Sequence, residues 1–298
     1  MIKKAFEVIK NNPVLVVMYL VYNAFVLIGM LVFLSDGIEQ SKNLAVMLAQ
    51  LGKMYLYFAI VGVIGLLFVS GAGAMLAEAV VKGKTSISSF FPFVKKFFGR
   101  ILLSALLMIA YAIVFSIALS IIITVPIVLI TLSSGLNTGG AAATTNMVSG
   151  MTTATSALTM LIVLIALPFF AHWFPSIFMD DTTVIKGMLN GFKSAKKNYG
   201  KLILIVLAIY LPTMFYTVYS LMNTTFSLGS NAVKDMMGSP VYYAQILISV
   251  VISVIVIPML FITYYEHQLK LAAQAMGQAG QLDQSDASAP DNGGESSQ

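Results

Sequence analysis

The chain has 298 residues, of which 58% are hydrophobic and only 10% are charged, and its mean hydropathy is +0.90. Soluble domains carry about 25% charged residues, so this composition excludes a soluble globular fold. Cysteine is absent, which excludes disulfides and thiol chemistry and leaves the redox compartment open. The net charge of +5 does not indicate a nucleic-acid partner, because its distribution between loops matters more than its sum.

Six uncharged apolar stretches are each long enough to cross roughly 30 Å of hydrocarbon at about 1.5 Å per residue. They lie near Val14–Leu34, Met54–Leu76, Ile101–Leu132, Leu158–Met179, Leu202–Met222 and Tyr243–Tyr265. No small-residue cleavage site closes the first stretch, so we expect no cleavable signal peptide. The third stretch is overlong, and we expect it to kink at Pro126 or to unwind into the loop that follows.

The lysine and arginine residues predict the orientation of these spans. Of the 17 basic residues, 14 lie at the N-terminus, after the second span, after the fourth span or in the tail, and three lie on the opposite side. This asymmetry predicts a multi-pass protein of the plasma membrane with both termini in the cytoplasm. The uncharged outer loop at 133–157 is expected to be flexible. Residues 277–298 are expected to form a disordered acidic tail.

One ten-residue pattern occurs before the third span and again before the fifth. Phe91 to Arg100 and Phe192 to Lys201 share the pattern F-x-x-x-K-K-x-aromatic-G-basic, 101 residues apart. A degenerate third copy begins at Phe6, before the first span. Apolar residues at helical spacing accompany each copy, as in the fullest one, Asp180–Lys201. Each copy therefore predicts an amphipathic helix, here termed an elbow helix, that lies on the membrane surface and leads into a span.

The predicted fold is all-α, with six transmembrane helices and three cytoplasmic-side elbow helices in a parallel threefold internal repeat. The integral membrane domain would cover residues 1–276, in units of about 1–80, 81–179 and 180–276. A parallel repeat differs from the inverted repeat common in secondary transporters. The alternative is that a shared need for basic cytoplasmic edges produced the matching sequences by chance.

This layout resembles a superfamily of six-span bacterial and archaeal membrane proteins. The superfamily includes the YciC-like proteins and the membrane domain attached to some glycerophosphodiester phosphodiesterases. The resemblance rests on the segment from Phe178 to Gly187, on Ser194 to Lys201, and on the final span, which contains Pro258 and ends in Tyr264 and Tyr265. It implies the six-span fold. The phosphodiesterase catalytic domain is missing here, so no hydrolase activity carries over.

The candidate site residues form three groups. Basic residues at the elbow helices are expected to contact anionic lipids, or merely to enforce topology: Lys95, Lys96, Arg100, Lys193, Lys196, Lys197 and Lys201. Asp180 and Asp181 are expected to cap a helix, although with Glu78 they could instead form a metal or acid–base site. Gly71, Gly73 and Ala77 are expected to allow close helix packing, with a pore lining as the alternative.

His172 is the sole titratable candidate inside the spans. A functional histidine needs a partner, and the sequence offers only Trp173 and Ser176 nearby, so we expect an interfacial histidine beside the single tryptophan. No phosphate-binding, zinc-protease or nucleophile-elbow motif is present. We therefore expect no enzyme activity, no cofactor and no metal ion.

Two functions fit these features. The first is a membrane scaffold or lipid-environment module. The second is a transporter or permease subunit for a small or lipidic solute, whose path would be lined by the proline-containing third, fourth and sixth spans. The expected partners are the lipid bilayer and the anionic lipids of its inner leaflet, with no nucleic acid. A protein partner or a homo-oligomer stays open.

Overall fold

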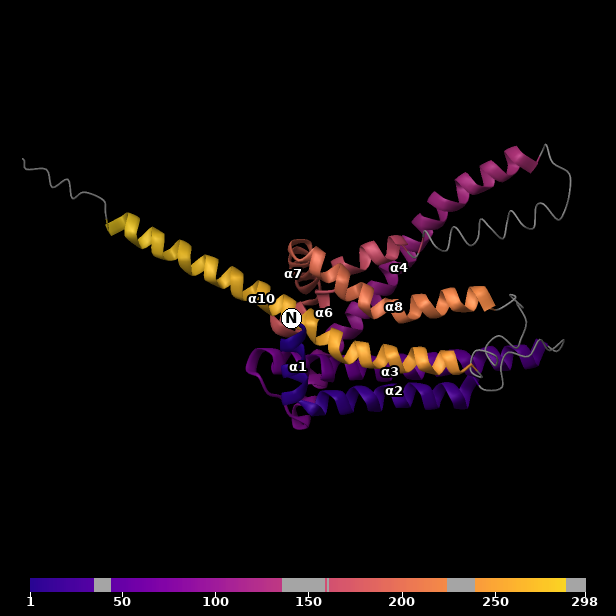
Figure 1. Ribbon diagram of the computed structural model, residues 1–298, viewed down its shortest axis with the longest axis horizontal. Helices are drawn as coiled ribbons and strands as arrows, with labels where there is room; N and C mark the ends of the chain where they lie inside the picture. Colours follow the sequence, from indigo (N-terminus) through magenta and orange to yellow (C-terminus); the bar gives the residue numbers. More distant parts are fainter. Residues whose placement is uncertain (35–43, 136–158, 160, 224–238, 288–298) are drawn as a thin grey trace, which may run out of the picture.

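The computed structural model describes residues 1–34, 44–135, 159, 161–223 and 239–287 (Figure 1). Most of the predicted outer loop and the last residues of the predicted tail lie outside these ranges. Every regular element within them is helical. The elements are α1 (Ile2–Asn11), α2 (Pro13–Leu34), α3 (Leu44–Lys82), the short 3₁₀-helix η1 (Ile87–Ser89), α4 (Phe90–Gly135), α6 (Trp173–Met179), α7 (Val184–Lys197), α8 (Tyr199–Asn223) and α10 (Pro240–Ala287). Residues 161–170 are also helical.

Five helical segments are long and apolar enough to cross a membrane. They are Pro13–Met30, Leu48–Lys82, Ile87–Ala118, Leu161–Met179 and Pro240–Met276. A sixth is formed if α7 and the first part of α8, which meet at 101°, are counted together. This confirms the prediction of an all-α chain with several potential membrane spans.

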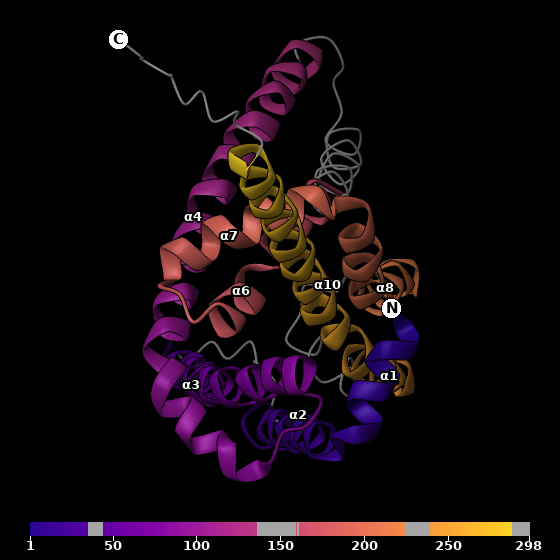
Figure 2. The same cartoon turned by 90° about the vertical axis from the view of Figure 1, so that its left-hand side faces the viewer.

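In the view of Figure 2, α4 lies on the left, α3 and α2 lie below, α1 and α8 lie on the right, and α10 crosses between them. Helix α2 contacts α3, α3 contacts α4, and α10 contacts α8, α3, α2 and α1. The short helix α6 contacts α3, α4, α7 and α10. One end of the bundle is formed by α1, the α3–η1 connection at residues 83–86, η1, the start of α4, α6 and α7. We call it the basic end.

Small residues of α3 let neighbouring aromatic rings approach its backbone. An added Cβ on Gly71 would lie 2.2 Å from the Phe90 ring, and one on Gly73 would lie 2.6 Å from the Phe178 ring. Ala77 is buried in the same core as Phe178. These three positions, which the sequence indicated for close packing, therefore face helices α4 and α6.

Two of the three predicted elbow helices are separate helices, whereas the second is continuous with its span. Helix α1 ends before Asn12, and α7 ends before Asn198. At both positions the asparagine side chain donates a hydrogen bond to the carbonyl four residues earlier, at 2.8 and 3.0 Å. Asparagine favours such local bonds over helix continuation. The second copy has Phe97 at the aligned position, and there α4 runs on without a break.

Two other expectations concern helix ends. The third span was expected to kink at Pro126 or to unwind into the loop that follows, and the unwinding is wrong, because α4 continues through Pro126 to Gly135. The kink stays a prediction. Helix α10 continues to Ala287, so residues 277–287 are helical instead of disordered.

Candidate functional site

The fourth potential span breaks near the basic end. Pro168 lacks a backbone N–H, and the Ala171 N–H donates to the Pro168 carbonyl at 3.2 Å in a tight turn. The chain restarts as α6, with His172 as its N-cap residue. The break turns His172 and Trp173 into the centre of the bundle, where their exposed fractions are 0% and 1%.

Two glycines of α7 allow that helix to lie directly on α6. An added Cβ on Gly191 would lie 2.8 Å from the carbonyl carbon and oxygen of His172, and one on Gly187 would lie 2.6 Å from Ile177. The Ser176 hydroxyl donates to the Gly187 carbonyl across this contact. Because backbone meets backbone here, α6 and α7 form one tightly packed unit.

His172 forms a buried pair with a serine of α7. Its Nδ1 lies 2.9 Å from the Ser194 hydroxyl oxygen, and its ring meets that of Tyr264 edge to face at 5.4 Å. The expectation that His172 lies at the membrane interface is thus wrong, because the break before α6 buries its side chain completely. Ser194 is also fully buried, so a substrate has no route to the pair in this conformation. The contact joins α6 to α7.

Asp180 connects three helices through its side chain. It accepts a hydrogen bond from the Tyr264 hydroxyl of α10 and one from Asn190 of α7 at 3.2 Å. Gln268 donates to the same Tyr264 oxygen at 2.7 Å. With His172, Ser176 and Ser194, these residues form what we call the buried polar cluster.

Asp181 binds α4 through two cations. Its carboxylate lies 2.8 Å from Lys96 Nζ and 2.6 Å from Arg100 Nη1, and Arg100 also donates to the Thr182 carbonyl at 3.2 Å. Asp181 has a φ of 51°, a left-handed conformation that aspartate tolerates better than most residues.

These contacts correct one prediction. The N-cap of α7 is Thr183, which makes no side-chain cap bond, so Asp180 and Asp181 do not cap that helix. Lys96 and Arg100 bind Asp181, and their expected contact with anionic lipids stays a prediction. Glu78 is engaged elsewhere, accepting from Lys82 at 3.0 Å and from Thr85 at 2.9 Å. In the part of the chain that the structure describes, no group of three metal-binding side chains comes together.

The Asp181 ion pairs predict a pH dependence of stability. Hydrogen bonds from Lys96 and Arg100 hold the pKa of Asp181 below its ordinary value of 3.8. A lowered folded-state pKa contributes stability above the unfolded value and loses it as the pH falls through the folded value. Asp181→Asn should therefore lower the unfolding midpoint by a constant amount above about pH 5, and this difference should shrink below about pH 4.

Thermal unfolding of both proteins over that pH range tests this prediction. The carboxylate is half exposed, so solvent screening keeps the difference small. Asparagine also tolerates the left-handed backbone, which isolates the effect of charge. A difference that is the same at every pH would contradict the assignment to the Asp181 charge.

The basic end also carries exposed apolar and basic side chains on each predicted elbow. Phe6 of α1, Phe91 of α4 and Ile185 of α7 are 53%, 77% and 62% exposed. The exposed residues that belong to this rim are Ile2, Phe6, Ile87, Phe91, Ile185, Leu189 and Phe192. The remaining predicted lipid-contact residues, Lys95, Lys193, Lys196, Lys197 and Lys201, are exposed too. We call these two sets together the amphipathic rim.

Comparison with known families gives one result. A family model described as "Domain of unknown function (DUF7847)" matches residues 1–267. The chain belongs to this family. No curated protein and no solved structure gives a match. The relation to YciC-like proteins therefore stays a prediction.

The region that matches the DUF7847 family runs from Met1 into α10 and ends one residue before Gln268. It thus includes the amphipathic rim and, apart from Gln268, the buried polar cluster.

In this DUF7847 chain, the sequence did not reveal the packing contacts of Ser194, Asn190 and the glycines of α7. The spacing of Gly187 and Gly191, a G-x-x-x-G motif, was a signal that could have revealed the close contact.

Proposed function

We propose that the chain is a non-enzymatic scaffold of the plasma membrane, with the amphipathic rim embedded in the cytoplasmic leaflet and both termini in the cytoplasm. The exposed apolar face of α7 beside its lysines carries this proposal. Since α7 meets α8 at 101°, a spanning α8 places α7 close to the membrane plane. An amphipathic helix there buries its apolar face among the acyl chains, and each nearby lysine adds about 1 kcal/mol of attraction to anionic lipids.

The contacts at the basic end support a rigid scaffold. Asp180 and Asp181 tie α7 to α10 and α4, and α1 is tied to α10 by an ion pair of 2.6 Å between Lys4 and Glu266. The asparagine breaks at Asn12 and Asn198 also support a common origin of the first and third elbow helices, as in the proposed parallel repeat. Such ties would hold the rim at a fixed depth.

Depth measurement on single-cysteine variants tests the position of the rim. The chain lacks cysteine, so a spin label can be placed at Leu189→Cys on the apolar face of α7. In anionic liposomes this label should be more accessible to oxygen than to a water-soluble relaxation agent. A label at Lys197→Cys, about 80° further round the same helix on its lysine-bearing side, should show the opposite preference. Equal accessibility of position 189 to the water-soluble agent would overturn the proposal.

Charge neutralisation predicts how the rim depends on lipid headgroups. Replacing Lys193 and Lys197 with glutamine should reduce the immersion of the label at position 189 in anionic vesicles and leave it unchanged in zwitterionic ones. High salt should give the same reduction in the unmodified protein, because surface charges are screened. The same loss in both vesicle types would mean that the lysines act through folding rather than through lipid.

The alternative function, a transporter or permease subunit, is favoured by a polar cleft between α2 and α10. These are the first and sixth potential spans, not the third, fourth and sixth that were expected to line a path. Reconstituted protein separates the two functions. Specific solute flux, or lipid scrambling well above that of empty vesicles, would replace the scaffold proposal.

A further inference from the structure

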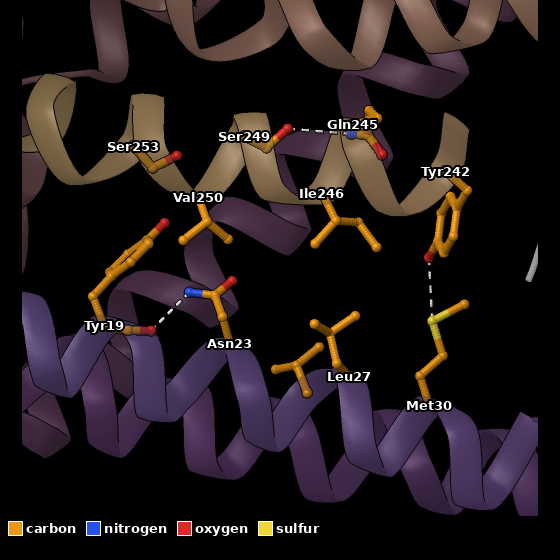
Figure 3. Close-up of a pocket in the computed structure, with 11 residues that line it drawn as sticks. Tyr19, Asn23, Leu27, Met30, Tyr242, Gln245, Ile246, Ser249, Val250 and Ser253 are labelled. Carbon is orange, nitrogen blue, oxygen red and sulfur yellow. Dashed lines mark hydrogen bonds between the residues drawn. The ribbon is translucent and has the colours of Figure 1, made fainter. Parts of the chain in front are cut away.

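A cleft of about 260 Å³ opens between α2 and α10, within the potential spans of both helices (Figure 3). Tyr19 and Asn23 point from α2 toward α10, and Ile246 and Val250 point back from α10. The complete lining is Tyr19, Asn23, Val26, Leu27, Met30, Tyr242, Gln245, Ile246, Ser249, Val250 and Ser253. Six of these eleven side chains are polar and none is charged.

Some polar groups of the cleft are satisfied by neighbouring residues. Asn23 Nδ2 donates to the Tyr19 carbonyl at 2.8 Å, and Gln245 Nε2 donates to Ser249 at 3.2 Å and to Thr213 of α8 at 3.4 Å. Tyr242 donates to the Met30 sulfur at 3.2 Å. These bonds use both N–H groups of the Gln245 amide and one of the two N–H groups of the Asn23 amide.

The amide oxygens of Asn23 and Gln245 and the hydroxyls of Tyr19 and Ser253 have no hydrogen-bond partner within the described residues. Polar atoms without partners are costly in an apolar medium. Two carbonyl acceptors and two hydroxyls are therefore free to bind a group that donates hydrogen bonds. A hydroxyl group of a ligand meets this requirement and can also accept a bond from Ser253.

The absence of charge from the lining selects against phospholipids. The charge of a phosphate group is costly to bury in an apolar setting unless a cation compensates it, and none of the eleven lining residues is lysine, arginine or histidine. An uncharged head carries no such requirement. The cleft thus discriminates against the phosphate-bearing lipids that make up most of a bilayer.

The volume limits how much of a lipid can enter. At about 30 Å³ per water molecule, the cleft corresponds to about nine waters, and it lies below the roughly 300–1,000 Å³ of sites for drug-sized ligands. It can hold a small head, such as a glycerol unit, and not a whole lipid. The hydrocarbon tails would then remain in the bilayer.

We propose that the α2–α10 cleft binds the uncharged, hydroxyl-bearing head of a membrane lipid through Asn23, Gln245 and Ser253. Two kinds of lipid carry this chemistry: glycerol lipids without a phosphate and long-chain isoprenoid alcohols. This site lies along the spans and is independent of the amphipathic rim. It adds a specific ligand class to a scaffold and is also compatible with transport of such a lipid.

Photo-crosslinking of the whole protein in nanodiscs tests this site. Three diazirine probes are used: a diacylglycerol, a polyprenol and a phosphatidylglycerol, each with the photoreactive group near its head. Mass spectrometry then maps the labelled residues. We expect diacylglycerol or polyprenol, whichever is the better ligand, to label α2 and α10 at the cleft, and unlabelled lipid of the same type to compete. Phosphatidylglycerol should label lipid-facing positions evenly.

Variants identify the groups that bind. Asn23→Leu and Ser253→Leu each remove a polar partner and fill the cleft, so labelling there should fall at least about fivefold, the equivalent of one lost hydrogen bond. Ser116→Leu on the exposed face of α4 is the matched control and should label as the unmodified protein does. Size-exclusion chromatography shows whether each variant is folded.

Two results would overturn the proposal. One is equal labelling of the cleft by phosphatidylglycerol, which would mean that it is filled by bulk lipid. The other is unchanged labelling of a folded Asn23→Leu variant together with unchanged labelling of Ser253→Leu. Failure of either kind leaves the position of the rim untouched, because the depth measurement on α7 does not involve the cleft.

Discussion

Gly191→Ala is expected to destabilise the basic end strongly. Its Cβ would lie 2.8 Å from the carbonyl carbon and oxygen of His172 and 2.9 Å from the Cα of Trp173. Overpacking costs about 1–3 kcal/mol and occasionally more, and here the obstacle is backbone, which cannot rotate away as a side chain can. Trp173 is the only tryptophan, so its fluorescence reports the disturbance directly. The thermal midpoint should fall, and the emission should shift to longer wavelength.

Two other glycines provide the control. A Cβ on Gly62 or Gly200 would meet no atom within 4 Å, and alanine favours helix over glycine by about 1 kcal/mol. Gly62→Ala and Gly200→Ala should therefore keep or raise the midpoint. If Gly191→Ala behaved as these do, α6 and α7 would not be packed backbone to backbone.

Tyr264→Phe is the second substitution with a large expected effect. The hydroxyl donates to Asp180 and accepts from Gln268, and Tyr264 is fully buried. Its removal leaves a carboxylate and an amide with one partner fewer, which typically costs about 1–3 kcal/mol for a buried group. Thermal unfolding and protease resistance of the α6–α7 segment should both decrease.

A neighbouring tyrosine supplies the matched control. Tyr265 is adjacent in the sequence, and its hydroxyl makes no hydrogen bond in the described part of the chain, so Tyr265→Phe should be nearly neutral. A double-mutant cycle with Asp180→Asn isolates the coupling between Tyr264 and Asp180. Additive effects of the two substitutions would show that this contact contributes nothing to stability.

The local features of the fold could be read from the sequence. The apolar stretches indicated the long helices, and the pattern that begins at Phe6 and recurs at Phe192 marked the starts of spans. The failure at the second copy has a local reason as well. Asn12 and Asn198 break their helices by bonding back to the preceding turn, whereas Phe97 continues the helix and packs on Phe178 at 5.2 Å between ring centroids. The pattern predicted the basic edge of a span, but it did not predict whether the helix ends before that span.

The partners of the polar residues could not be read from the sequence. Tyr264 and Asp180 are 84 residues apart, and Arg100 and Asp181 are 81 apart. Helical periodicity shows which side chains share a face, but it does not show which helix that face will meet. For the same reason Lys96 and Arg100 were indistinguishable from the exposed Lys95. Only the tertiary arrangement of the helices brings these groups together.

The position of α10 has a consequence for how the protein is made. The helix is synthesised after α1, α6 and α7, yet it supplies Tyr264 to Asp180 and Glu266 to Lys4. Before α10 packs against α6 and α7, the polar groups of these two helices are not shielded on the side that α10 occupies. A chain truncated before residue 240 should therefore present an open bundle with exposed polar groups, a state that membrane quality-control proteases can recognise. Completion of the bundle is thus tied to the synthesis of α10.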